Sequence, residues 1–191
     1  MVPDFRNVTG FDDIYSRFLI AARSIMLGHD LIFDQFAERA LHITSLELYL
    51  RCNQWLDPNT DKNSEQGNSN TWYIRRRGSN ANTSRVDITA GCAADNIYCG
   101  LLVRGIDGDD GSGRAIKRIL RGGEKVSGLS WLTEEIKSLD QIHGSQIMEG
   151  PLRLKRREKP LVRNLSPKPR MGLEYSEYPW NQNLRIVVEQ T

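Results

Sequence analysis

The chain has 191 residues, of which 39% are hydrophobic and 26% are charged. A chain of this size and composition can bury one sizeable core without disulfide bonds or a structural metal ion, so a single domain spanning residues 1–191 is expected. It contains no apolar run of the roughly 18 to 20 residues that a membrane span needs. The first residues also lack a charged leader followed by an apolar stretch. We therefore expect an intracellular protein, nuclear or cytoplasmic, with no membrane partner.

The formal net charge of +2 conceals an uneven distribution. Between Arg114 and Arg170 there are 14 Lys/Arg and 6 Asp/Glu, a balance of +8 that leaves −6 for the rest of the chain. Such a region can face a polyanion, although charge runs are more often solvated surface. Cys52, Cys92 and Cys99 form an odd set without metal-binding spacing, so we expect free, buried thiols.

The first predicted element is a helix over residues 12–27, because apolar side chains recur there at helical spacing and Gly28 follows. A short strand is predicted over residues 30–33 and a long one over 40–50. Residues 53–70 are rich in Asn, Asp, Ser and Gly, which predicts a long and flexible loop.

The rest of the chain is predicted to be mainly strand in the middle and mixed toward the end. We expect a β-hairpin with a polar tip at residues 71–89 and a buried strand at 100–106. Helices are expected to start at 114–120 and within 130–138. An extended, irregular stretch is expected at 155–170 and a terminal strand at 183–188. This pattern predicts an α+β domain with a curved, mainly antiparallel sheet flanked by helices.

The long strand places a charged residue among apolar ones. Successive side chains of a strand alternate between faces, so the leucines of residues 46–50 share one face while Glu47 and Tyr49 lie on the other. Burial of an ionised carboxylate is costly unless it is paired or hydrogen-bonded. Glu47 is therefore a candidate general base or acid. The alternative is that Glu47 points to the sheet edge or forms an ion pair with an arginine such as Arg104.

Asp87 repeats this pattern in the hairpin, where a solvated outer face is its alternative placement. If Glu47 and Asp87 face one cleft, one carboxylate can activate water while another group stabilises an oxocarbenium-like sugar, which suits cleavage of a glycosidic bond. Two nearby carboxylates can equally hold a divalent cation.

Two basic runs are candidates for phosphate contacts. The first is Arg75, Arg76 and Arg77 at the hairpin tip, beside the aromatic residues Trp72 and Tyr73. The second is residues 153–159. Core packing is the alternative for the two aromatic residues, and a solvated linker is the alternative for the second run.

Several segments occur in an order that resembles one protein family. They are AARSIMLGHDLI at 21–32, SLELYL at 45–50, WYI at 72–74, VDIT at 86–89, LLVRGID at 101–107, and RMGLEY, Trp180 and LRIVV between 170 and 188. They are similar to the "LARxLLGxxLV", "ETEAYLG", "YVY", "MNIS", "VLLRALEP" and "RVGI…W…LRFYV" segments of the 3-methyladenine (alkyladenine) DNA glycosylase family. The resemblance covers most of the chain and implies one compact domain around a curved antiparallel sheet.

The resemblance also implies an activity and roles for particular residues. Enzymes of this family flip a damaged purine out of duplex DNA into an aromatic pocket and hydrolyse its N-glycosidic bond without a metal or other cofactor. Glu47 would activate the attacking water. Tyr49, Asp87 and Tyr73 would line the base pocket, and Arg104 would order the carboxylates or bind a backbone phosphate.

The substrate is left open by these patterns. We expect a monomer that acts on a modified purine in nucleic acid, with duplex DNA first, or on a free nucleoside or nucleotide. The alternative is a non-catalytic module that binds a modified nucleobase or another small ligand in the same pocket.

Overall fold

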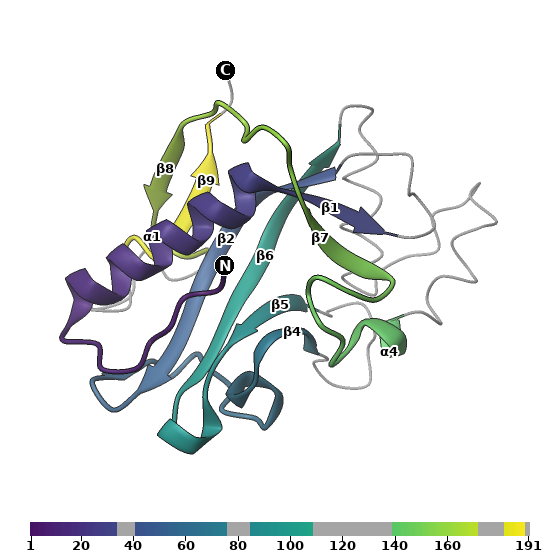
Figure 1. Ribbon diagram of the computed structural model, residues 1–191. Helices are drawn as coiled ribbons and strands as arrows, with labels where there is room; N and C mark the ends of the chain where they lie inside the picture. The colour runs from purple at the N-terminus through teal and green to yellow at the C-terminus, as the bar shows by residue number, and fades with distance from the viewer. Residues whose placement is uncertain (34–40, 76–84, 109–138, 172–181, 190–191) are drawn as a thin grey trace.

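The computed structural model describes residues 1–33, 41–75, 85–108, 139–171 and 182–189. In these ranges a long helix lies across one face of a strongly curled antiparallel sheet (Figure 1). This is the α+β architecture that the sequence predicted. The helices predicted to begin at residue 114 and within 130–138 lie outside the described residues.

The described elements, in chain order, are α1 (Phe11–Gly28), β1 (His29–Phe33), β2 (Leu41–Cys52), β3 (Trp55–Leu56), the 3₁₀ turn η2 (Glu65–Gly67), β4 (Ser69–Arg75), β5 (Arg85–Ala90), the 3₁₀ turn η4 (Ala93–Asp95), β6 (Tyr98–Gly108), the short helix α4 (Leu139–Ile142), β7 (Leu152–Arg156), β8 (Leu165–Lys168) and β9 (Arg185–Val188). The predicted helix, buried strand and terminal strand are confirmed, as is the antiparallel pairing of the two hairpin strands, whose predicted polar tip lies outside the described residues.

Helix α1 forms because its apolar residues make one stripe. Ile14, Phe18, Ala22 and Ile25 are completely buried and belong to the core shared with the sheet. Their spacing of three or four residues keeps them on the side of the helix that faces the sheet. No helix among the described residues is long and apolar enough to cross a membrane.

The described strands form one nine-stranded sheet with the order β4-β5-β6-β2-β1-β7, and β9 pairs with both β2 and β8. All pairs are antiparallel, and the longest runs between β2 and β6. The register of that pair is irregular between Ile43 and Leu46. Such irregularities increase the local bend and twist of a strand, which fits the curl of the sheet.

Two stretches differ from their predicted structure. Residues 155–170 were expected to be extended and irregular; parts of them are regular strand, because Lys155 and Arg156 end β7, which pairs with the whole of β1, and β8 pairs with β9. Burial of Leu152 and Leu154 attaches β7 to the core, while the basic residues between and after them face outward. Residues 53–70 were predicted as one loop, but they contain β3, η2 and the start of β4.

The three cysteines are free, as predicted, but not equally buried. Cys52 and Cys99 are buried in the sheet, whereas Cys92 is half-buried and its thiol donates to the Asp95 carboxylate over 3.0 Å. The prediction of three buried thiols is therefore wrong for Cys92, because it lies at the start of η4 rather than in a strand of the sheet.

Candidate functional site

The two faces of β2 have different roles. Leu46, Leu48 and Leu50 are completely buried in the core with α1. Glu47 and Tyr49 alternate with these leucines and so point to the opposite face of the sheet. The prediction that Glu47 lies on a face apart from the leucines is thus confirmed.

A row of side chains crosses the sheet at Glu47. Glu47 is paired with Leu102, Leu102 with Asp87, and Asp87 with Tyr73. On the other edge of β2, Glu47 is paired with Arg185. Because directly paired residues of neighbouring strands share a face, the fold brings three sequence-predicted site residues onto one face. Glu47 and Asp87 are two strands apart, so their backbones are separated by about 10 Å.

Glu47 is buried and extensively hydrogen-bonded. Its side chain is completely buried, and it accepts three hydrogen bonds from described residues. Arg104 Nε donates to Oε2 over 2.7 Å, Tyr49 Oη to Oε2 over 3.1 Å, and the backbone N–H of Met171 to Oε1 over 2.8 Å. All three donors complement a negative charge. A carboxylate has about four acceptor positions, and the described residues supply one donor to Oε1 and two to Oε2.

The sequence left open that Glu47 forms an ion pair with an arginine such as Arg104, and the structure contains this pair. Burial by itself would lower the pKa of Arg104, but the neighbouring Glu47 carboxylate outweighs it and the net shift is upward. Arg104 therefore remains a cation beside Glu47. The pKa of Tyr49 is also raised, first by burial and then by the charge of Glu47, so its hydroxyl stays protonated and keeps donating.

A second buried ion pair adjoins the first. Asp57 and Arg170 are both completely buried, and Arg170 Nη1 donates to Asp57 Oδ2 and to the carbonyl of Leu48, the latter over 3.2 Å. The Arg170 guanidinium also lies over the Tyr49 ring, 4.9 Å from its centre. Tyr49 therefore links the two pairs, since its hydroxyl binds Glu47 and its ring supports Arg170. The role of Tyr49 in lining a base pocket stays a prediction.

The Asp87 end of the row is also polar and buried. Asp87 is 2% exposed, and its carboxylate packs over Gly100, where an added Cβ would lie 2.7 Å from Asp87 Oδ2 and 3.2 Å from the amide nitrogen of Gln66. Glycine at position 100 thus lets Asp87 and Gln66 approach the sheet together. Gln66 is held by η2, where its side-chain oxygen accepts the Lys62 backbone N–H over 3.1 Å.

Tyr73 lies at the far end of this row. Its hydroxyl accepts a hydrogen bond from the Asn63 side-chain amide, and its ring centre is 5.7 Å from that of His143. Arg75 ends β4, and Arg76 and Arg77 lie outside the described residues. The phosphate contacts expected of these three arginines stay a prediction.

Sequence reasoning missed Asp57, Gln66 and Arg170. The first two lie in a polar stretch without periodicity, and Arg170 ends a stretch expected to be irregular. A buried arginine and a buried aspartate become visible only when the fold brings together residues 113 positions apart. The described residues include no group of three or more His, Cys, Asp or Glu side chains arranged to hold a metal ion.

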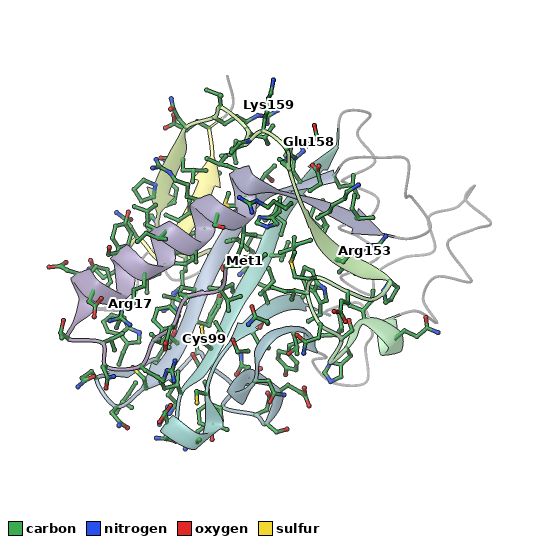
Figure 2. All side chains as sticks on the ribbon, in the orientation of Figure 1. Met1, Arg17, Cys99, Arg153, Glu158 and Lys159 are labelled. Atoms are coloured by element: carbon green, nitrogen blue, oxygen red, sulfur yellow. The ribbon has the colours of Figure 1, made fainter. Side chains whose placement is uncertain are left out.

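Cys99, on β6 (Figure 2), provides a test of burial around this site. Its thiol pKa is raised well above the ordinary value by burial and then by the charge of Asp87. The unfolded thiol ionises at about pH 8.5, whereas the folded thiol remains protonated there because its pKa is raised. The unfolded chain thus loses a proton that the folded chain keeps, and stability falls as pH rises through this value, by up to about 1.4 kcal/mol per pH unit.

We expect Cys99→Ala to reduce this pH dependence by about one proton, measured by urea unfolding between about pH 7.5 and 9.5. Cys92→Ala, which removes a half-buried thiol outside the sheet, is the comparison variant, and the loss of slope in Cys99→Ala should exceed the change in Cys92→Ala. An unchanged slope in Cys99→Ala would contradict the prediction.

A large cavity lies elsewhere in the molecule. It has a volume of about 1250 Å³ and is formed by the end of α1 and the segment after β7, and none of its lining residues belongs to the centre around Glu47. The size of a cavity therefore does not identify the candidate active site. The buried charged groups around Glu47 identify it.

These features define an α+β protein with a buried carboxylate and arginine centre on the polar face of a curled antiparallel sheet. No protein-family model matches the chain, and no curated protein matches its sequence.

Proposed function

We propose that the polar face of the sheet binds a modified purine nucleotide, in DNA in the first instance, and that Glu47 activates the water that hydrolyses its N-glycosidic bond. The observation that carries this proposal is the complete burial of Glu47 with Arg104, Tyr49 and the Met171 backbone as its donors. A carboxylate held in this way is positioned to accept a proton from water and to stabilise positive charge on a sugar.

The arrangement of the row supports the proposal. Asp87 and Gln66 place acceptor and donor groups side by side over Gly100, about two strands from Glu47. Groups of this kind read the edge of a purine, and Tyr73 adds an aromatic ring at the end of the row. The family resemblance in the sequence supports the same assignment and implies chemistry without a metal.

Glu47 is completely buried, whereas Met171, whose backbone N–H binds the carboxylate, is 50% exposed. On this proposal a single extruded base reaches Oε1 beside Met171.

A binding module without turnover is the second candidate. It is favoured by the fact that Glu47 is engaged by an arginine and two further donors, and by the second ion pair behind it. In that case the centre would order the sheet and form a pocket for a nucleobase. Ligand binding without cleavage would distinguish this function from hydrolysis.

The test is base release by the full chain under single-turnover conditions. The substrates are duplex and single-stranded oligonucleotides carrying hypoxanthine, ethenoadenine or an alkylated purine, beside the matching free nucleosides and nucleotides. We expect release from at least one oligonucleotide, and weaker binding of it as salt rises, because phosphate contacts release counterions. Folded protein that binds these ligands without releasing a base would favour the binding module, and release from nucleosides alone would move the substrate to small molecules.

A further inference from the structure

The large cavity beside α1 has a distinctive lining. Exposed large hydrophobic side chains are few among the described residues, and three of the six, Met1, Met148 and Val162, line this one cavity. Val162 is 100% exposed and Met148 is 44% exposed. A local concentration of exposed apolar groups of this kind is typical of an interaction surface.

The same cavity carries unpaired positive charge. Arg23, Arg156 and Arg163 line it, and none of them forms an ion pair with a described carboxylate. Arg157 also contributes to the wall but is paired with Asp30. Glu158 is the single acidic residue among the described residues that line the cavity, beside Arg23, Arg156, Arg157 and Arg163, so this described lining has a net positive charge.

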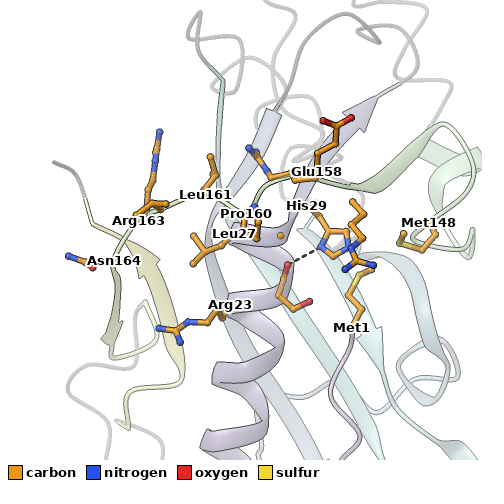
Figure 3. Close-up of a pocket in the computed structure, with 15 residues that line it drawn as sticks. Met1, Arg23, Leu27, His29, Met148, Glu158, Pro160, Leu161, Arg163 and Asn164 are labelled. Atoms are coloured by element: carbon orange, nitrogen blue, oxygen red, sulfur yellow. Dashed lines mark hydrogen bonds between the residues drawn. The ribbon is translucent and has the colours of Figure 1, made fainter.

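The arginines are not needed to complete the end of α1. The carbonyl of Leu27 accepts the backbone N–H of Leu161 over 2.8 Å, and that of Gly28 accepts the N–H of Arg157 over 2.9 Å. His29 Nδ1 lies 2.8 Å from the carbonyl of Ser24 and donates to it (Figure 3). Because these last carbonyls already have partners, the free guanidinium groups are available to something else.

The shape of the cavity favours a polypeptide over a small ligand. Its volume of about 1250 Å³ exceeds the roughly 300–1,000 Å³ that is usual for small-molecule sites. Figure 3 shows Arg23 and Arg163 on one side of Leu27 and Leu161, with His29 and Met148 on the other. Arg23 and Arg163 therefore lie beside apolar residues of the lining. Figure 2 shows Glu158 and Lys159 on the segment that forms its upper wall.

The chemistry of the lining favours a protein partner over nucleic acid. Methionine and arginine are enriched in protein interfaces. No Phe, Tyr or Trp is among the described residues that line the cavity, so it offers no platform on which bases could stack. Its exposed apolar groups would also remain unused against a phosphate backbone.

We propose that this cavity is a docking site for an acidic peptide segment that carries apolar side chains, supplied by a partner protein. The apolar side chains enter between Leu27, Met148 and Val162, and the carboxylates pair with Arg23, Arg156 and Arg163. The site is independent of Glu47 because α1 lies on the opposite face of the sheet from that residue.

The test is a selection of binders from a random peptide display library on the immobilised full chain, followed by fluorescence anisotropy with the selected peptides. We expect sequences that combine Asp or Glu with Leu, Ile or Phe. The variant Arg156→Glu/Arg163→Glu should weaken their binding by at least about tenfold, and so should Met148→Ser/Val162→Ser, because both charge and apolar contact contribute. All four side chains are solvent-accessible, so the variants should fold.

Lys168→Glu is the matched charge control. Lys168 is an exposed cation on β8 that does not line the cavity, and its reversal should change binding little. A labelled single-stranded oligonucleotide tests whether the cavity binds a polyanion instead of a peptide. If the oligonucleotide competes with the peptides and its binding responds to the arginine variant but not to Met148→Ser/Val162→Ser, the cavity is a polyanion site and the proposal fails. It also fails if no selected peptide depends on these four residues.

Discussion

Replacement of Glu47 by Gln is expected to lower single-turnover base release by about 10²- to 10⁴-fold, the range that general acid–base groups supply. Gln keeps the shape of the side chain but cannot accept a proton from water at neutral pH. It also brings an N–H₂ group against one of the three donors, Arg104, Tyr49 or the Met171 backbone, which now bind carboxylate oxygens. Some loss of stability, about 1–3 kcal/mol, should accompany the loss of activity.

Three comparisons separate a chemical role from a structural one. Urea unfolding of Glu47→Gln establishes that the variant is folded at the assay temperature. Tyr49→Phe removes one hydrogen bond but retains the carboxylate, so it should lose much less activity. Glu149→Gln alters an exposed carboxylate and should behave as wild type. Base release by folded Glu47→Gln at the wild-type rate would exclude Glu47 as the base.

The sequence predicted the face of the strand on which Glu47 lies better than it predicted the hydrogen-bond donors of Glu47. Alternation along β2 was enough to separate Glu47 and Tyr49 from the leucines, because a strand embedded in a sheet has a period of two. The sequence also indicated Arg104 as a possible ion-pair partner of Glu47. In the observed register Leu102 is opposite Glu47, and Arg104 is two residues further along the same strand. The residue pattern within a strand was therefore sufficient where a contact is made between neighbouring strands of the sheet.

The missed residues depend on contacts between distant parts of the chain. Asp57 follows a two-residue strand in a stretch that reads as a polar loop, and its burial is determined by Arg170. The pairing of β7 with β1 was missed because basic residues dominate that stretch. The alternation of Leu152 and Leu154 with Arg153 and Lys155 was the available signal for a strand. By contrast, no local signal reports that the Met171 backbone N–H binds Glu47.

The Asp57–Arg170 pair gives the largest expected effect on stability. Both side chains are completely buried, and removal of one member leaves the other as an uncompensated charge. We expect Asp57→Ala to lower the free energy of unfolding by about 3–5 kcal/mol, measured by urea denaturation. The Arg170 guanidinium also supports the Tyr49 ring, so the variant should loosen the hydroxyl that binds Glu47.

The double variant Asp57→Ala/Arg170→Met distinguishes loss of the pair from loss of packing. Met occupies much of the volume of the arginine side chain without its charge, so the double variant should be more stable than Asp57→Ala alone, because no buried charge is left unpaired. Asp4→Ala, which breaks the exposed pair with Arg6, is the control and should change stability little. If Asp57→Ala matched this control, the pair would contribute little to the fold. If the double variant lost as much stability as the two single changes added together, the two side chains would be energetically independent, and the centre behind Glu47 would be held by packing rather than by charge.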